Sequence, residues 1–145
     1  MCFSPSLLWC FDCYLISVNS KGGFPDHPHR GMETVTYMFP HSTGAFEHED
    51  FMGSRGTLKP GYLQWMTAGR GIVHSEMPAS GLEGKTAHGL QLWISLAKKD
   101  KMCEPAYQEL PPEKVPKVKK DGIEAHVIAG SALGTDSPIY TNGPC

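Results

Sequence analysis

Two short histidine-bearing steps are the part of this chain whose residue types could do chemistry. The first is His27-Pro28-His29, followed at the fourth residue by Glu33, and the second is His74-Ser75-Glu76. In an extended strand residues two apart point to the same face, so each pair can bind one ion. Imidazoles with a carboxylate suit Fe(II), Mn(II), Cu(II), Ni(II) or Zn(II) better than Ca²⁺. The sequence therefore predicts a transition-metal site.

The elements that must position these residues read as β-strands. Segment 33–39 alternates and is rich in β-branched and aromatic residues, as a half-buried strand is. We expect further strands at 47–52, 62–67, 72–77, 89–96 and 123–129, and the beginning of another at 138–141. Turn signals such as Lys59-Pro60-Gly61 and Gly69-Arg70-Gly71 separate them. This pattern predicts an all-β fold, an antiparallel meander or jelly-roll barrel.

Composition sets the broad class of the protein. A chain of 145 residues with 40% hydrophobic residues is long enough for one domain with a modest core. The formal charge of −2 does not indicate direct nucleic-acid binding. Small molecules or proteins are the expected partners.

The N-terminal segment needs separate treatment. The apolar stretch 7–18 is too short, and too interrupted by Asp12 and Ser17, to span a bilayer. A secretory signal cleaved near Val18-Asn19-Ser20 would lack a basic region before Lys21, which makes secretion the weaker reading. The alternative is a strand-like or poorly ordered leader. Cys10-Phe11-Asp12-Cys13 has the spacing of a redox or zinc half-site but no second half, so buried or incidental thiols are favoured.

Beyond Ala97 the character of the chain changes. Residues 98–101 are expected to form a solvated turn, and the proline-rich segment 104–120 an extended arm with one helical turn near 107–110. The lysines of this arm are interpreted as a solvated loop, with contact to an acidic partner as the alternative; they are Lys114, Lys117, Lys119 and Lys120.

The remaining polar and aromatic candidates have plainer readings. The solitary histidines are expected at the surface or satisfied in the core; they are His41, His48, His88 and His126. Glu47-His48-Glu49-Asp50 resembles a second metal cluster, but a polar strand without an ion is favoured. Trp65 and Trp93 are expected in the core rather than against a substrate.

Four ordered strings carry a family resemblance. They are Asp26–Gly31 with Glu33–Tyr37, then Leu63–Pro78, then Gly89–Trp93, and finally Glu104-Pro105 with Tyr107–Leu110. Together they resemble the pirin family over about residues 22–141. Pirins belong to the cupin superfamily and have two β-barrel domains, of which the N-terminal one binds a non-haem metal.

The resemblance implies a ligand set. His27, His29, His74 and Glu76 would be the metal ligands, with one Fe(II)/Fe(III) per chain as the usual occupant and other divalent transition metals as alternatives. The general cupin pattern would also recruit Glu33. Because Glu76 already fills the carboxylate position, Glu33 is expected to play a supporting or structural role instead.

Two functions follow from the resemblance. One is quercetin 2,3-dioxygenase activity on a flavonol and O₂, in which Glu76 would be the catalytic base for the 3-hydroxyl while remaining a ligand. The other is a transcriptional coregulator in the nucleus and cytoplasm that binds transcription factors rather than DNA, without turnover.

The departures from the family pattern divide the chain into three parts. Residues 1–20 are interpreted as a leader unrelated to the family, 21–97 as the cupin metal-binding core, and 98–145 as an arm with terminal strands that stops before a second cupin domain. This predicts an incomplete barrel whose unpaired edge is partly filled by 7–18 as a substitute strand. We expect weaker iron retention, lower activity and self-association relative to a two-domain protein.

Overall fold

The computed structural model describes residues 11–19, 21–81 and 83–142, and almost all regular structure within them is β. The strands of the main body are β1 (Phe11–Asn19), β2 (Phe24–His29), β3 (Met32–Met38), β4 (Phe46–Asp50), β5 (Arg55–Leu58), β6 (Leu63–Thr67), β7 (Ile72–Pro78), β8 (Thr86–Ser95) and β9 (Ala106–Leu110). A 3-10 turn, η1 (Pro112–Lys114), leads to two small hairpins, β10 (Lys117–Lys120) with β11 (Ile123–His126) and β12 (Ser131–Ala132) with β13 (Thr135–Asp136). The expected all-β antiparallel class is confirmed.

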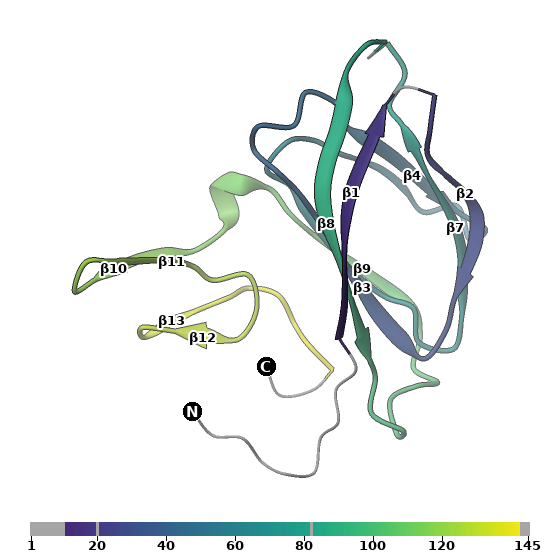
Figure 1. Cartoon of the computed structure of the whole chain (residues 1–145). Coiled ribbons are helices and arrows are strands. Elements are labelled where there is room, and N and C mark those ends of the chain that lie inside the picture. Colours follow the sequence, from purple (N-terminus) through teal and green to yellow (C-terminus); the bar gives the residue numbers. More distant parts are fainter. Residues whose placement is uncertain (1–10, 20, 82, 143–145) are drawn as a thin grey trace.

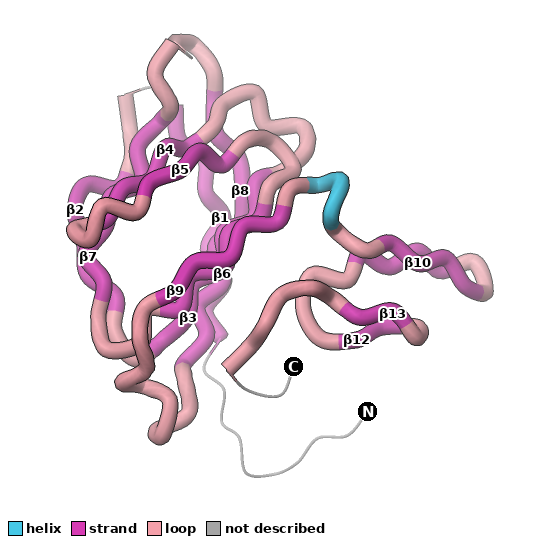
Figure 2. The backbone as a smooth tube through the Cα atoms, turned by 180° about the vertical axis from the view of Figure 1, so that it is seen from behind, coloured by secondary structure: helices cyan, strands magenta, loops and turns pink. Residues whose placement is uncertain are grey.

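Two antiparallel sheets face each other (Figures 1 and 2). One has the strand order β1-β8-β3-β6-β9 and the other the order β2-β7-β4-β5. Among the described strands, no ladder joins β1 to β2 or β9 to β5, so the barrel is not closed. The two small hairpins stand to one side of it, as both views show.

Local sequence explains where the strands end and which lie at an edge. β2 contains Pro25 and Pro28, which cannot donate to a ladder, and it is an edge strand paired only with β7. The turn between β6 and β7 places Gly69 at a φ of 49°, where a Cβ atom would collide with the carbonyl oxygen of Cys103. Glycine is therefore required there.

The five-stranded sheet has different chemistry on its two faces. Its outer face is apolar and carries a cluster that includes Val35, Trp65 and Ile94, packed against Ile139 from the C-terminal segment. The inner face presents polar side chains such as Thr36 and Gln91 toward the other sheet. Smaller apolar clusters lie toward either end of the interior; one includes Met38 and Phe46, and the other Met66 and Ile72.

Most predicted strands are confirmed. Strands β3, β4, β6, β7, β8 and β11 overlap the expected segments, with boundaries that differ by a few residues. Residues 11–18 of the expected substitute strand form part of β1, which pairs with β8 from Phe11↔Ile94 to Asn19↔Thr86. Residues 7–10 of that expectation lie outside the described residues.

Three expectations for the C-terminal region are wrong, and β5 was not predicted. The helical turn expected near 107–110 is strand β9, because this segment pairs with β6 from Leu63↔Leu110 to Thr67↔Ala106. The lysines at 117, 119 and 120 lie in strand β10 rather than in a loop, although their side chains are exposed as expected. Residues 138–141 do not form a strand.

Within the described part of the chain, no helix is long and apolar enough to cross a membrane.

Candidate metal centre

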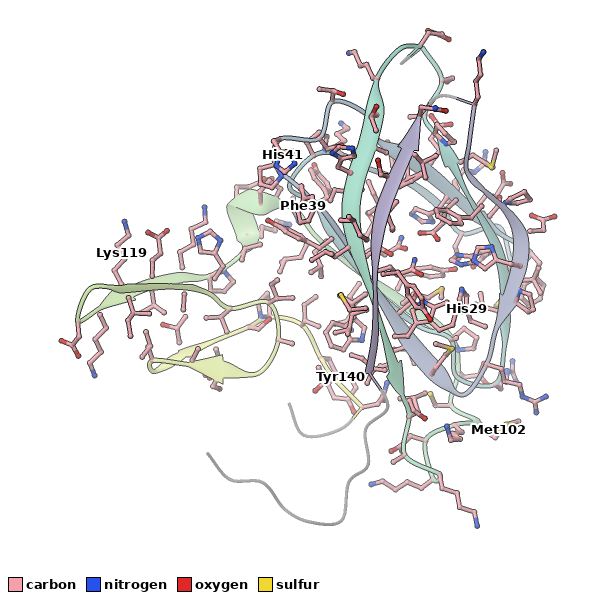
Figure 3. All side chains as sticks on the ribbon, in the orientation of Figure 1. His29, Phe39, His41, Met102, Lys119 and Tyr140 are labelled. Carbon is pink, nitrogen blue, oxygen red and sulfur yellow. The ribbon has the colours of Figure 1, made fainter. Side chains whose placement is uncertain are left out.

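Strands β2 and β7 bring three histidines together inside the barrel. The antiparallel register places His27 opposite His74, and His29 follows two residues along β2. One ring nitrogen from each lies within 4.8 Å of the others. His29 and His74 are 4% and 2% exposed, and Figure 3 shows His29 between the two sheets.

The nitrogens of these histidines are available for an ion. Nδ1 of His27 lies 2.8 Å from the carbonyl oxygen of Pro25, an arrangement in which Nδ1–H donates and Nε2 keeps its lone pair. Neither ring nitrogen of His29 or His74 has a hydrogen-bond partner, although both rings are buried. Unpartnered buried polar atoms are costly, and a bound cation would satisfy them.

Electrostatics keeps the buried rings neutral. Burial first, and the charge of His27 second, lower the pKa of His29 to about 4. Burial first, and then the charges of His27 and His29, lower the pKa of His74 to about 3. Both rings are therefore in the neutral form that binds metal at physiological pH.

Glu76 lies in the same interior, outside the group of ring nitrogens that lie within 4.8 Å of one another. It is 2% exposed and points inward from β7, two residues after His74. The set of mutually close ligand atoms found among the described residues does not include it. Its oxygens instead accept hydrogen bonds from Nε2 of Gln91, at 3.2 Å and 3.5 Å. Burial raises the pKa of Glu76, and the hydrogen bond from Gln91 opposes that rise.

Glu33 belongs to the opposite face of the sheet. Its Oε1 accepts hydrogen bonds from Oγ1 of Thr67 at 2.8 Å and from Nδ2 of Asn142 at 3.0 Å. It is buried on the outer face, beside the segment that covers the apolar cluster. This geometry fits the structural role rather than a role as ligand.

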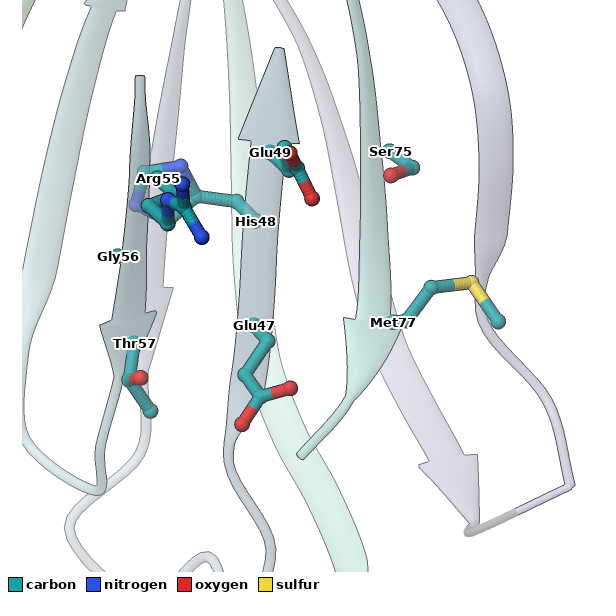
Figure 4. A pocket seen from close by; sticks show the side chains of 8 residues that line it. All are labelled: Glu47, His48, Glu49, Arg55, Gly56, Thr57, Ser75 and Met77. Carbon is teal, nitrogen blue, oxygen red and sulfur yellow. The ribbon is translucent and has the colours of Figure 1, made fainter. Parts of the chain in front are cut away.

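The acidic tetrapeptide 47–50 is divided by strand alternation. His48 and Asp50 are buried, whereas Glu47 and Glu49 face outward and line a hollow of about 470 Å³ on the outer side of β4 and β5 (Figure 4). Nε2 of His48 lies 2.9 Å from Oε1 of Glu109 on β9. The four residues therefore do not converge on one ion. His48 is buried as expected but only partly satisfied, because Nε2 has a partner and Nδ1 has none.

Sequence reasoning missed the polar residues of β8 and β3 beside the site. Gln91 is buried and bonds to Glu76 and Thr36. Trp93, expected to be a core residue, is half-buried and its ring lies edge-on to His29 with centroids 5.3 Å apart. The only available signal was the alternation of β8, which puts Gln91 and Trp93 on the face opposite Leu90 and Leu92.

Known proteins provide a second line of evidence. The family profile described as Pirin matches residues 6–94, and this match begins inside the segment interpreted as a leader. Pirin of Homo sapiens is 57% identical over 123 residues, which are 85% of this chain and 41% of that protein. The chain therefore spans about two fifths of the length of this relative.

Solved structures agree with the fold. Quercetin 2,3-dioxygenase from Acinetobacter baumannii is 34% identical with a TM-score of 0.75, covering 97% of this chain and 50% of that one. The bacterial pirin YhhW from Escherichia coli, solved in complex with nickel(II), is 30% identical with a TM-score of 0.61, covering 72% of this chain and 42% of that one. A cupin-type antiparallel fold with three convergent histidines and a profile match over more than half of its length places this chain in the pirin family.

Proposed function

We propose that this chain binds iron through His27, His29, His74 and Glu76 and acts as a quercetin 2,3-dioxygenase on a flavonol-type substrate and O₂. The observation that carries the proposal is the cluster of three histidines, in which the buried ring nitrogens of His29 and His74 have no hydrogen-bond partner. The similarity to a quercetin 2,3-dioxygenase of the same fold supports the reaction class.

The chain's own residues would divide the work as follows. The bound metal would supply Lewis acidity and open coordination positions for a chelating substrate and O₂. Glu76, whose pKa is raised by burial, is suited to accept the proton of the flavonol 3-hydroxyl. The ring of Trp93, packed against the buried His29, would help to exclude water from the reacting carbon atoms.

Access to the site is proposed along β2. His27 is only half-buried, in contrast to His29 and His74, and the neighbouring Phe24 is 37% exposed. The rings of Phe24 and His27 lie edge to face with centroids 6.5 Å apart. An aromatic substrate would therefore meet an aromatic surface beside the most exposed ligand.

Metal content and turnover of the purified chain test the proposal. The wild type should hold one iron per chain, consume O₂ with quercetin and release carbon monoxide. His74→Ala should lose both stoichiometric iron and turnover, whereas His126→Ala, in the exposed β11, should retain both. A wild-type chain that folds but binds no transition metal, or a His74→Ala variant with full occupancy, would contradict the ligand set.

A second candidate is an iron-dependent coregulator of the nucleus and cytoplasm that binds transcription factors without turnover. Three exposed apolar side chains favour a protein contact on the outside of the wall that carries His74; they are Phe51, Met52 and Val73, at 67%, 60% and 41% exposure. The backbone N–H of Phe51 donates to the carbonyl of Val73, so these residues are neighbours. Exposed apolar groups of this kind mark contact surfaces.

Partner binding and O₂ uptake distinguish the coregulator from the enzyme. Binding of transcription-factor domains that differs between the Fe(II) and Fe(III) forms, with no O₂ uptake on quercetin, would favour the coregulator. O₂ uptake that is insensitive to Phe51→Ser would favour the enzyme.

A further inference from the structure

The side chain of Gln91 is held by three partners at once. Nε1 of Trp93 donates to its Oε1 at 2.7 Å, and its own Nε2 lies 3.1 Å from Oγ1 of Thr36 and 3.2 Å from Oε2 of Glu76. Gln91 is 8% exposed, so these bonds form in a largely dry interior. They are stronger there than they would be in water.

The indole N–H fixes which way the amide of Gln91 points. An indole nitrogen can only donate, so the oxygen of Gln91 must face Trp93. The NH₂ group must then face Glu76 and Thr36. A carboxylate can only accept, and this orientation is therefore the one in which both contacts are satisfied.

Strand geometry keeps this arrangement in place. Gln91 and Trp93 are two residues apart on β8 and share the inner face, while Thr36 lies directly opposite Gln91 in the β3–β8 ladder. The indole ring of Trp93 also lies near the ring of Tyr14 on β1, with ring centroids 5.2 Å apart. The indole also packs against His29. One side chain thus contacts a histidine of the cluster and directs the amide that bonds to Glu76.

We propose that Gln91, oriented by Trp93, is a positioning residue that sets the carboxylate of Glu76 relative to the three histidines. This inference rests on the proposed metal site. Outer partners of this kind orient a ligand, and their loss costs about 10-fold to about 100-fold in metal affinity or activity. Gln91 is not one of the proposed ligands and would act only through Glu76.

Cobalt(II), added alone to the metal-free chain, is the probe. Gln91→Met keeps the length of the side chain but removes both hydrogen-bonding groups, and it should weaken cobalt binding by about tenfold and change the visible absorption bands, which report coordination number and geometry. Trp93→Phe keeps a ring against His29 but removes the N–H, and it should shift the same bands in the same direction by a smaller amount. Trp65→Phe is the matched control, because it removes an indole N–H that has no partner on the outer face. Its cobalt spectrum and affinity should equal those of the wild type.

The possible results of these cobalt experiments distinguish failure of the positioning role from failure of the proposed metal site. If the wild type binds no cobalt, the metal site and this inference both fail. If the wild type binds cobalt, and folded Gln91→Met and Trp93→Phe give the wild-type spectrum and affinity, only the positioning role is overturned. A lower melting temperature with an unchanged cobalt spectrum would likewise show that Gln91 and Trp93 serve stability alone.

Discussion

Oε1 of Glu109 lies 2.9 Å from Nε2 of His48, so a side chain of β9 reaches across the open seam between the two sheets to a buried side chain of β4. Nε2 of Gln64 approaches the same oxygen at 3.3 Å, and the ring of Tyr107 stacks on His48. Side chains rather than a backbone ladder therefore join the sheets at this seam.

Removing the carboxylate at the seam should loosen the contact between the sheets. Glu109→Ala leaves a buried nitrogen of His48 without its partner, and we expect a loss of about 1–3 kcal/mol in the free energy of unfolding. Glu109→Gln keeps an acceptor and should lose less. Urea denaturation of both variants measures the difference. Glu113→Ala, an exposed position in η1, is the control. Equal stability of Glu109→Ala and the wild type would show that the seam contact contributes nothing.

Gly56 should tolerate no side chain while the seam contact exists. It lies opposite His48 in the β4–β5 ladder, and a Cβ atom there would stand 2.5 Å from Nε2 of His48 and 2.8 Å from Oε1 of Glu109. Overpacking of this kind costs about 1–3 kcal/mol. We expect Gly56→Ala to destabilise by that amount, and less in a Glu109→Ala background, where one crowding atom is gone. A double-mutant cycle measures the coupling; strictly additive effects would refute it.

Glu76→Gln should separate proton transfer from metal binding. The amide keeps the size of the side chain but cannot accept a proton, so we expect kcat to fall by about 10²-fold to about 10⁴-fold while three histidines still retain iron with weakened affinity. Glu49→Gln, on the outward face of the neighbouring β4, is the matched control. Iron analysis and O₂ uptake on the same preparations test this. Turnover by Glu76→Gln at the wild-type rate would exclude Glu76 as the base.

The metal-free chain should lose stability on acidification. The folded-state pKa is lowered to about 4 for His29 and to about 3 for His74, whereas a histidine of the unfolded chain titrates near about 6.5. Below that pH the unfolded state binds more protons, so the stability contributed by these neutral rings is present above about pH 6.5 and is lost as the pH falls toward about 4 and then about 3. The loss should be on the order of a few kcal/mol.

A double variant isolates this effect from other titrations. His29→Gln with His74→Gln removes both rings and should flatten the dependence of the unfolding free energy on pH over that window. Glu76 acts in the opposite direction, because its pKa is raised and its protonated form favours the folded state at low pH. It is present in both proteins, and its effect cancels in the comparison. A wild-type curve as flat as that of the double variant would refute the prediction.

Local pattern was enough to predict most strands and the two halves of the site. Segment 33–39 alternates over Thr34–Tyr37. A period of two can be recognised from neighbouring residues alone. The pairing of His27 with His29, two residues apart on one strand, is equally local. That both rings meet His74 depends on the pairing of β2 with β7, which only the family resemblance could anticipate.

Long-range pairing explains what the sequence did not reveal. The segment 107–110 lies among prolines and reads as an arm, yet its ladder with β6 decides its conformation. Gln91 belongs to no metal-binding motif. Its proposed positioning role depends on its place opposite Thr36 and near Glu76 across the barrel. Glu33 lies on the outer face because β3 alternates, although it fits a ligand pattern in spacing.

The two faces of β8 have a consequence for how this fold can diversify. Leu92 packs outward against the apolar cluster, while Gln91 and Trp93 point into the interior, where the ring of Trp93 contacts His29. Adjacent positions of one strand thus have different roles: the outward residues stabilise the fold, and the inward residues line the interior. Substitutions at inner positions such as 91 and 93 could change the interior while Leu92 stays in the outer apolar cluster. Ala87 and Gly89 lie on the same inner face but are too closely packed to vary in this way.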